Sequence, residues 1–423
     1  MTHHILATSA LALSFGLATA AGADVSKTEV LTTYVDIAAA KYDDSLTTAK
    51  TLQAAVNNLI DAPSEETLSA ARSAWLDARV PYQQSEVYRF GNPIVDDWEG
   101  MVNAWPLDEG LIDYVDASYG GPTDANELAA LNVIANPSLS IAGKSIDATS
   151  ITPELISDTL NEADGIETNV ARGYHAIEFL LWGQDLNGTG PGAGERPYTD
   201  FATGDDCTNG NCDRRADYLR AATDLLVSDL EYMAAQWAPN GAARDTVLTS
   251  EGAGLVAILT GMGSLSYGEQ AGERMRLGLM LNDPEEEHDC FSDNTHNSHY
   301  YDALGIQSAY LGRYVRPDGS VIEGPSLADL TAEVDPALDA EMQSKLEATM
   351  SAMSDLKAAA DGGFSYDMML EQGNAEGEAL VMGGVNGLID QTRTIERIVV
   401  ALGLDQIAFE GSDSLDQPEA VFE

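Results

Sequence analysis

Basic residues are scarce in this sequence, and their scarcity argues against two classes of partner. The 423 residues include 21 Lys and Arg against 69 Asp and Glu, which gives a formal net charge of −48 at pH 7. A field of this sign repels nucleic-acid phosphates and anionic membrane surfaces, so we expect neither as a partner. The excess of acid fits a protein that attracts cations, and it fits equally well a surface adapted to salty surroundings.

Long apolar segments are also few. After the N-terminal region, the best is residues 252–265, which is too short and too rich in Gly to cross a membrane. The apolar run at 5–17 is followed by Ala21-Gly22-Ala23, an A-x-A cleavage pattern, although the residues before it include no Lys or Arg. We therefore predict a signal peptide at 1–23 and an exported mature chain without a transmembrane segment.

Cysteine is nearly absent, with three residues in the whole chain. Cys207 and Cys212 flank a short turn-forming loop, which in an exported protein indicates a local disulfide. Cys290 is then unpaired, or it replaces one of the two in either of the other pairings. A zinc half-site at Cys207 and Cys212 is less favoured, because no second half follows at zinc-like spacing.

Most of the remaining pattern is helical, with loops rich in Gly, Asn, Pro and Asp. Helices are expected at 24–61, 65–90 with a kink at Pro81, 150–163, 166–182, 213–237, 251–281, 326–360 and 374–402, with a loop at 91–107 and a small hairpin around Pro317-Asp318-Gly319. We predict an all-α fold of two four-helix-bundle-like domains packed against each other. The predicted divisions are an N-terminal domain at 24–185, a linker or loop at 186–212, a C-terminal domain with the hairpin at 213–405 and an acidic tail at 406–423.

The stretch 173–183 is the most informative in the chain. It reads as the end of a helix that is apolar on every side, and such helices are normally buried. His175 and Glu178 lie on it three residues apart, so they share one face. A buried carboxylate needs a partner. The pair is either a core His–Glu pair satisfied by another helix or half of a metal site, since helical bundles present imidazole and carboxylate ligands in this way.

Potential ligands are also dense at 283–299, where Glu, Asp, His and Cys crowd together. This segment is either part of a metal site or a solvated hydrophilic loop. Two other helices carry polar stripes: Glu86 and Arg89 on one, and Glu269, Glu273 and Arg276 on the other. The two glutamates of the second stripe are like charges one turn apart, so they need a cation: Arg276, Arg274 or a metal.

The sequence resembles the imelysin family, and more closely its iron-regulated protein A branch. Gly173, His175 and Glu178 match the G-x-H-x-x-E hallmark of that family. The resembling blocks are ARVPYQQSEVYRFG (78–91), VNAWPLDEGLIDY (102–114), GYHAIEFLLWGQD (173–185), GMGSLSYGEQAGERM (261–275) and DPEEEHDCFSDNTH (283–296). The resemblance implies two helical-bundle domains with a site between them that contains the His-x-x-Glu pair. It also implies a location in the periplasm or outer envelope of a Gram-negative bacterium.

Three functions remain open, and we expect the first. An iron-binding protein in iron acquisition needs imidazole and hard oxygen ligands within an acidic field, with an envelope receptor or iron transporter as partner. The second is a zinc metallopeptidase, which the family classification implies; it needs about three protein ligands and an open coordination position on the metal. We expect the bound metal to be iron, with zinc or copper as alternatives. Neither H-E-x-x-H nor H-x-x-E-H is present. The third is a metal-free partner-binding module that presents 283–299.

The predicted metal ligands are His175, Glu178, Glu86 and His296. Arg89 or Arg276 is expected to orient the carboxylates, and Trp182 to shield the pocket. Glu269 and Glu273 are reserve candidates.

Overall fold

The computed structural model describes residues 25–422, so the predicted signal peptide at 1–23 lies outside the described residues. The elements, with η for 3₁₀ and π segments, are α1 (Lys27–Asp61), α2 (Glu65–Gln83), η1 (Glu86–Tyr88), α3 (Pro93–Asn103), α4 (Glu109–Ile112), β1 (Ser138–Ile141), β2 (Lys144–Asp147), α5 (Pro153–Leu155), η2 (Ile156–Leu160), η3 (Ala163–Gly165), α6 (Gly173–Trp182), η4 (Tyr198–Phe201), η5 (Gly204–Asp206), α7 (Cys212–Trp237), α8 (Ala242–Leu248), α9 (Glu251–Ser264), η6 (Leu265–Arg276), α10 (Leu277–Leu281), η7 (Pro284–Glu286), η8 (Cys290–Ser292), α11 (Thr295–Leu311), β3 (Arg313–Val315), β4 (Val321–Glu323), α12 (Leu327–Val334), α13 (Pro336–Asp361), α14 (Tyr366–Leu370), α15 (Ala375–Ala401), α16 (Asp413–Asp416) and η9 (Ala420–Phe422). The prediction of an all-α fold with a small hairpin is confirmed.

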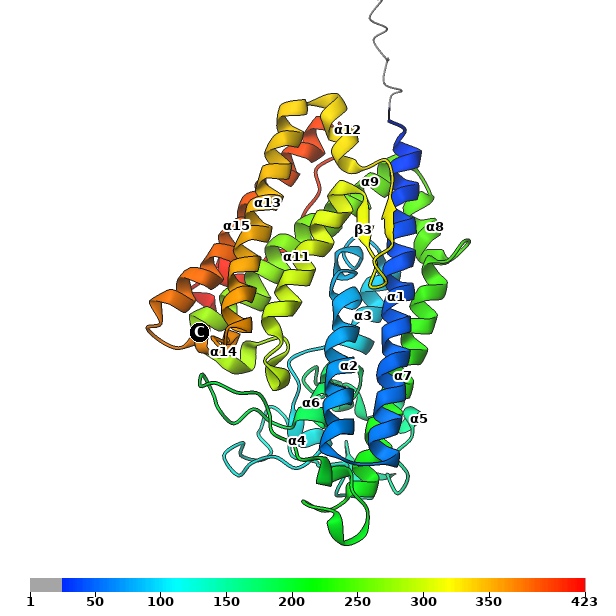
Figure 1. The fold of residues 1–423 in the computed structure, drawn as a ribbon, viewed down its shortest axis with the longest axis vertical. Coiled ribbons are helices and arrows are strands. Elements are labelled where there is room, and N and C mark those ends of the chain that lie inside the picture. Colours follow the sequence, from blue (N-terminus) through cyan, green and yellow to red (C-terminus); the bar gives the residue numbers. More distant parts are fainter. Residues whose placement is uncertain (1–24, 423) are drawn as a thin grey trace, which may run out of the picture.

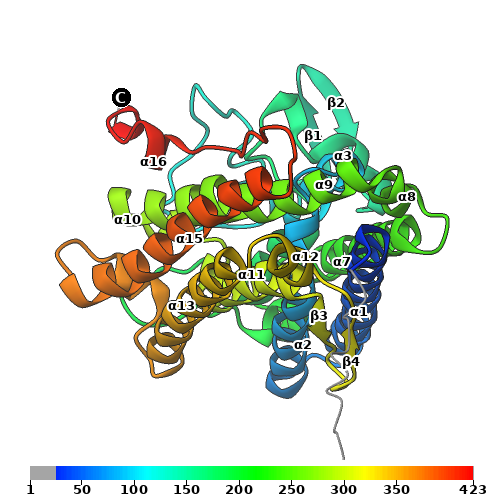
Figure 2. The same cartoon turned by 90° about the horizontal axis from the view of Figure 1, so that it is seen from above.

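The long helices form two packed groups that meet along α11 (Figures 1 and 2). In one group α1 lies along α2 and α7, and α6 packs against α2 and α7. In the other group α13 packs against α15, and α15 packs against η6. Helix α11 contacts α13 of one group and α2 of the other. Helix α7, which follows the predicted linker, packs against α1; the division into domains at 186–212 stays a prediction.

Sequence signals account for several helix boundaries. Ser64 accepts a hydrogen bond from the Thr67 amide, and Thr67 accepts one from the Ser64 amide, so this capping box begins α2. The helix predicted to run to 90 ends at Gln83, and Pro81 lies within its last turn. The chain then continues as the 3₁₀ turn η1.

Three local predictions differ from the structure. The expected loop at 91–107 contains the helix α3, with Pro93 at its first position. A second hairpin, β1–β2, pairs Leu139 with Ile146 and was not anticipated. The single helix expected at 326–360 is two helices, α12 and α13, because Asp335 caps a new helix that begins at Pro336.

The helix expected at 251–281 is continuous but changes type. Its middle part, η6, is a π-helix, in which hydrogen bonds join residues five apart. Glycines of this helix allow close approach of other segments: a Cβ at Gly261 would overlap the Val87 carbonyl, and one at Gly268 would overlap the Glu410 carbonyl. The π segment turns a different set of side chains inward than an α-helix would.

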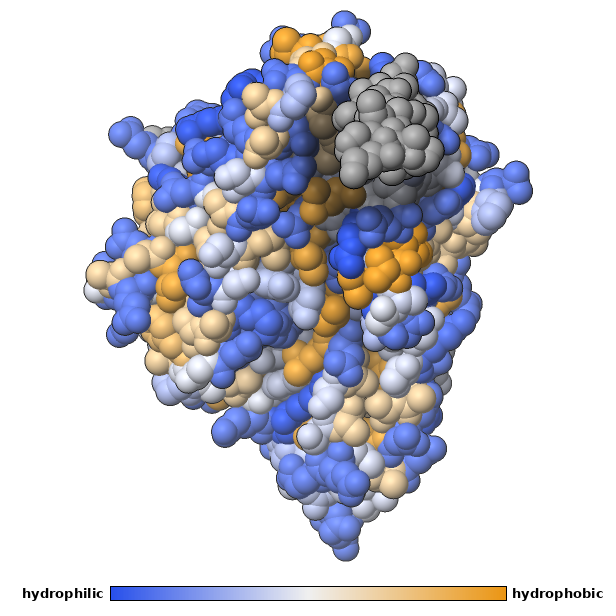
Figure 3. Space-filling model, turned by 45° about the horizontal axis from the view of Figure 1, so that its top comes forward, coloured by the Kyte–Doolittle hydropathy of each residue, from blue (hydrophilic) through white to orange (hydrophobic). Residues whose placement is uncertain are grey.

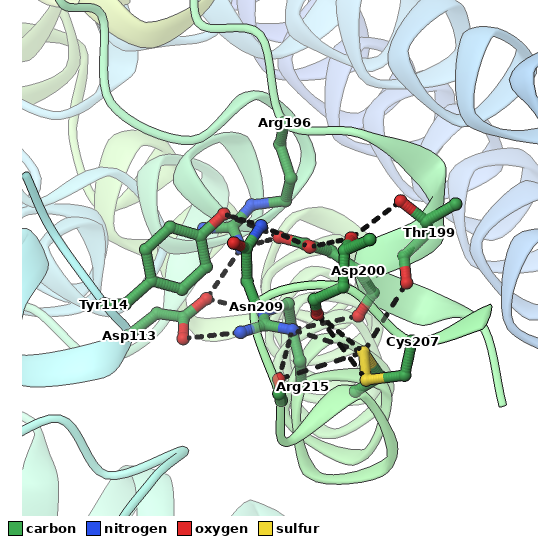
Figure 4. Close-up of a disulfide and its surroundings, with 11 residues drawn as sticks. Asp113, Tyr114, Arg196, Thr199, Asp200, Cys207, Asn209 and Arg215 are labelled. Atoms are coloured by element: carbon green, nitrogen blue, oxygen red, sulfur yellow. Dashed lines mark hydrogen bonds and ion pairs between the residues drawn. A yellow bond between two sulfur atoms is a disulfide. The ribbon is translucent and has the colours of Figure 1, made fainter. Parts of the chain in front are cut away.

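The segment between α6 and α7 is mostly irregular but is anchored by buried charges and by a disulfide between Cys207 and Cys212 (Figure 4). Arg196 and Arg215 both bind Asp113, at 2.7 and 2.6 Å. Cys290 is a free thiol in the described chain.

The described surface combines hydrophilic and apolar regions. Figure 3 shows hydrophilic residues over much of the face it draws, with hydrophobic residues in a broken strip down its middle. No single helix within residues 25–422 is long and apolar enough to span a membrane; one bent pair, Cys212–Leu248 with Glu251–Leu281, meets that criterion jointly by length and composition alone.

Candidate metal centre

Helix α6 is buried along its whole length, as predicted, although it begins at Gly173 and not at 166. Gly173 has φ +82°, and its α-carbon faces the Val102 backbone so closely that a Cβ would overlap it. Glycine is therefore required at the start of this helix. His175 and Glu178 follow within the first two turns and are 1% and 0% exposed.

The His175 and Glu178 side chains contact each other. His175 Nδ1 lies 3.1 Å from Glu178 Oε2. The other carboxylate oxygen of Glu178 accepts hydrogen bonds from the amide and hydroxyl of Ser292, at 3.0 and 2.7 Å. One oxygen of Glu178 is thus held by the 283–299 segment, while the other faces the imidazole.

The 283–299 segment is largely buried and brings two more potential ligands to α6. His288 is 2% exposed and Asp289 is fully buried. The ligating atoms of His175, His288 and Asp289 all lie within 4.8 Å of one another. The Asp289 Oδ1 atom is 3.9 Å from His175 Nδ1 and 3.8 Å from His288 Nδ1. Two imidazoles and two carboxylates, including Glu178, therefore converge in the interior.

Arg79 of α2 closes one side of this cluster. Its Nη2 atom donates to Asp289 Oδ1 at 2.7 Å and lies 3.3 Å from His288 Nδ1. The second oxygen of Asp289 accepts hydrogen bonds from Asn294 and Ser298, at 2.7 and 2.5 Å. Asp289 is thus fixed in orientation as well as neutralised.

The electrostatics keep both imidazoles neutral, which is the form that binds metals. Burial, reinforced by the Arg79 charge, lowers the pKa of His175 to about 3. Burial and the charge of Arg274 hold the pKa of His288 well below its usual value. The two carboxylates differ: burial and the Asp289 charge raise the pKa of Glu178, whereas Arg79 outweighs burial and lowers the pKa of Asp289.

The structure places Glu86 next to this cluster and not in it. Glu86 Oε2 accepts hydrogen bonds from Arg274 at 2.7 Å and from Asn103 at 3.4 Å. The same Asn103 amide nitrogen is 3.4 Å from His288 Nε2. Glu86 is therefore connected to the imidazoles through Asn103, in the way that a residue orienting a ligand would be.

Of the two arginines considered as partners of Glu269, the structure places Arg274 beside it, and not Arg276. Arg274 contacts Glu86, Glu269 and Asp302, at 2.7, 2.7 and 3.2 Å. Glu269 and Arg274 are five residues apart, and the π-helix η6 makes such residues neighbours. Arg276, whose spacing from Glu269 and Glu273 suits an α-helix, instead lines a separate cavity together with Tyr267.

The other predicted residues lie further out. His296 does not join His175; its Nε2 is 3.3 Å from Asp361 Oδ1. Arg89 contacts Asp96 and Glu269, so it does orient carboxylates, but not those beside His175. Trp182 packs edge-on against Trp75 with ring centroids 5.4 Å apart. Whether any of these side chains serves a metal site stays a prediction.

A cleft of about 320 Å³ leads to His288. Trp105 and Pro106 form part of its wall, and the charged groups of the wall are Arg89, Arg274 and a larger number of carboxylates. The carboxylates lining it are Glu99, Glu269, Glu273 and Glu286. Such a wall raises the local concentration of cations.

Two features of the cluster were missed from the sequence. His288 and Asp289 lie in the ligand-rich segment, but the pattern did not single them out from His296. Arg79 lies on α2 and is buried, and a buried Arg requires a buried acid. The joint presence of an unexplained Arg and a crowded acidic segment is the signal that could have paired Arg79 with Asp289.

Comparison with known proteins agrees with this architecture. The family model described as Imelysin matches residues 38–395. A stretch of 79 residues is 33% identical to iron-regulated protein A of Synechococcus elongatus, covering 19% of this chain and 20% of that protein, so the match spans about a fifth of the relative's length.

Two solved structures share the fold. A protein described as an iron-regulated protein A precursor, from Parabacteroides distasonis, has a TM-score of 0.63 at 19% identity and covers 90% of this chain and 97% of its own. An imelysin-like protein from Psychrobacter arcticum has a TM-score of 0.52 at 16% identity and covers 91% and 99%. The resemblance expected from the sequence is confirmed, and the chain belongs to the imelysin family.

Proposed function

We propose that this protein binds a metal ion, iron in the first place, at His175, Glu178, His288 and Asp289, and that it acts in iron acquisition as an exported protein. The observation that carries the proposal is the convergence of two neutral imidazoles with two carboxylates in a buried site, with three of the ligating atoms within 4.8 Å of one another. The names of the relatives, an iron-regulated protein and a precursor, support the metal and the export.

His175 fits a metal ligand in a way that a satisfied core histidine does not. His175 Nε2 is buried and has no hydrogen-bond partner among residues 25–422. A satisfied core histidine would use both ring nitrogens. Two imidazoles with carboxylate oxygens suit divalent iron, and they also suit zinc. The acidic cleft beside His288 favours a cargo ion that enters from solution.

Metal analysis of untagged protein tests the proposal. Wild-type protein from iron-replete cells should contain about one iron per chain. His175→Ala and His288→Ala should lose it, because each removes an imidazole ligand. His296→Ala is the matched control, because the His296 imidazole contacts Asp361 and not the proposed ligands. Equal metal content in all four proteins, or a loss in His296→Ala as large as in His288→Ala, would contradict the proposed ligand set.

A zinc metallopeptidase is the second candidate, and the position of Glu178 favours it. Its carboxylate adjoins His175, its pKa is raised, and it could therefore act as a general base towards a metal-bound water. Glu178→Gln separates the two functions. Retained zinc with abolished peptide hydrolysis supports the peptidase, whereas lost iron binding supports the binding protein. No metal in the wild type, with unchanged stability of the variants, supports a partner-binding module.

A further inference from the structure

A second group of carboxylates comes together from three segments that are distant in the sequence. Asp185 follows α6, Asp293 lies between η8 and α11, and Asp367 belongs to α14. One ligating oxygen from each lies within 4.8 Å of the other two. Glu287 lines the same small cavity as Asp185.

Two of these acids are buried without compensation. Asp367 is 2% exposed and Glu287 is 1% exposed. Neither oxygen of either carboxylate has a hydrogen-bond partner within the described part of the chain, and Asp293 Oδ1 is likewise buried and unpartnered there. A carboxylate in this state is costly unless a cation or a proton accompanies it.

The charges around the group are of one sign. Burial, followed by the Asp367 and Asp185 charges, raises the pKa of Asp293 to about 7. At Asp289 an Arg reverses the effect of burial; here the strongest neighbouring charges are other carboxylates.

A small cavity large enough for one ion lies beside Asp185 and Glu287, while Asp293 and Asp367 lie outside its lining. Its volume is about 20 Å³, and Asp185, Glu287, Glu109 and Glu285 line it together with Cys290. About 10–15 Å³ is enough for one water-sized particle. The carboxylates of its wall offer several oxygen ligands for a cation.

We propose that Asp185, Asp293 and Asp367, with Glu287 beside them, form a second cation site, distinct from the His175 cluster, that takes a hard divalent cation, Ca²⁺. The set contains carboxylate oxygens and no imidazole, which suits calcium better than iron or zinc. Magnesium keeps most of its water and rarely uses an all-carboxylate cage. The site does not rest on the function proposed for the His175 cluster.

A cation here would tether the elements that carry that cluster. Asp185 comes three residues after Trp182, the last residue of α6, and Glu287 immediately precedes His288. Bound Ca²⁺ would hold the end of α6, the 283–299 segment and α14 together. We infer a structural cation that fixes the distance between His175 and His288.

Calcium titration by calorimetry tests the site. Full-length mature protein, stripped with EDTA, is titrated at about 0.15 M salt so that diffuse binding to the acidic surface is screened. We expect one Ca²⁺ per chain, with at least tenfold weaker binding in Asp367→Asn and Asp185→Asn. His175→Ala should bind Ca²⁺ as the wild type does. Asp361→Asn is the matched control, because Asp361 is half-exposed and already paired with Lys357.

Thermal unfolding provides a second readout. Ca²⁺ should raise the melting temperature of the wild type and of Asp361→Asn, but not that of Asp367→Asn. Without Ca²⁺, Asp367→Asn should melt above the wild type, since it removes a charge from a like-charged group. If Asp367→Asn does not fold, Asp185→Asn decides. Equal calcium affinity in all variants, or no binding site beyond that of general surface charge, would overturn the proposal.

Discussion

Two buried clusters of charge in this protein are built in opposite ways. Beside the disulfide, Asp113 and Asp200 have all four carboxylate oxygens occupied: Arg196 and Arg215 bind Asp113, while Arg196, Tyr114, Thr208 and Asn209 bind Asp200 (Figure 4). Around the 283–299 segment, by contrast, His175 Nε2, Asp367 and Glu287 have buried polar atoms without partners in residues 25–422.

The difference separates structural charges from candidate binding groups. Ion pairs and hydrogen bonds that occupy every oxygen of the buried carboxylates hold chain segments together. A buried polar atom without a partner costs free energy that a bound ion can recover. The two clusters, which burial does not separate, are therefore distinguished by the ring nitrogen of His175 and the carboxylate oxygens of Asp367 and Glu287, which are unpartnered within the described residues.

The largest expected effect comes from breaking the satisfied cluster. Asp113→Ala leaves Arg215 and Arg196 buried without their main counter-charge, so the free energy of unfolding should fall by about 3–5 kcal/mol. Urea unfolding of the oxidised protein measures it. A loss below about 1 kcal/mol would show that the network contributes little.

The pH dependence of stability sharpens this prediction. Burial opposes ionisation of Asp113, but the Arg196 and Arg215 contacts outweigh it and lower its pKa. A lowered pKa means that its contribution is complete above the unfolded value, near pH 4, and is lost as the pH falls through the folded value. Asp113→Asn should therefore unfold with a shallower acid dependence below about pH 4, as measured by urea midpoints.

Removal of the disulfide should have a smaller effect on the same cluster. Cys207 and Cys212 are five residues apart, and so short a loop contributes about 2 kcal/mol in the chain-entropy model. Urea unfolding of the Cys207→Ser/Cys212→Ser double variant measures it, with Cys290→Ser as the control for thiol removal. A loss as large as that of Asp113→Ala would mean that the disulfide, and not the ion pairs, holds this region.

In the cluster beside α6, stability should change little while metal affinity changes. Ser292→Ala removes the hydroxyl that orients Glu178 but leaves the amide contact. We expect roughly tenfold weaker metal binding, the lower end of the range for residues that orient ligands. Competition with a metal chelator measures the affinity. Unchanged affinity together with lower stability would assign Ser292 to packing alone.

The smallest effect is expected at an exposed pair. Arg313 and Glu323 are 3.3 Å apart on the surface of the β3–β4 hairpin. Arg313→Ala should change the free energy of unfolding by less than about 1 kcal/mol, as is usual for exposed ion pairs. A urea midpoint shift comparable to that of Asp113→Ala would show that burial does not explain why the Asp113 ion pairs stabilise the protein more than this exposed pair.

The sequence was sufficient for the parts of the fold and the candidate site that depend on local pattern. Helix α6 is apolar on all sides and carries two ionisable groups, so its burial and the meeting of His175 with Glu178 followed from the periodicity. Pro93 marked the start of α3, and this signal was overlooked.

The rest depended on tertiary packing. The histidines at 288, 296 and 299 lie in similar polar sequence. The local sequence therefore does not reveal that His288 packs against His175 of α6 while His296 pairs with Asp361. Arg274 replaced Arg276 because the helix changes its winding, and no single-residue propensity records that change.

That change of winding sets a limit on how the chain can vary. One residue added or removed between Glu269 and Arg274 would rotate every later side chain of the helix by about 100° and shift it by about 1.5 Å along the axis. Arg274 would then turn away from Glu86 and Asp302, and those acids would face each other unneutralised. Homologous chains that keep this arrangement must therefore preserve the length of η6, whatever residues they place along its outer face.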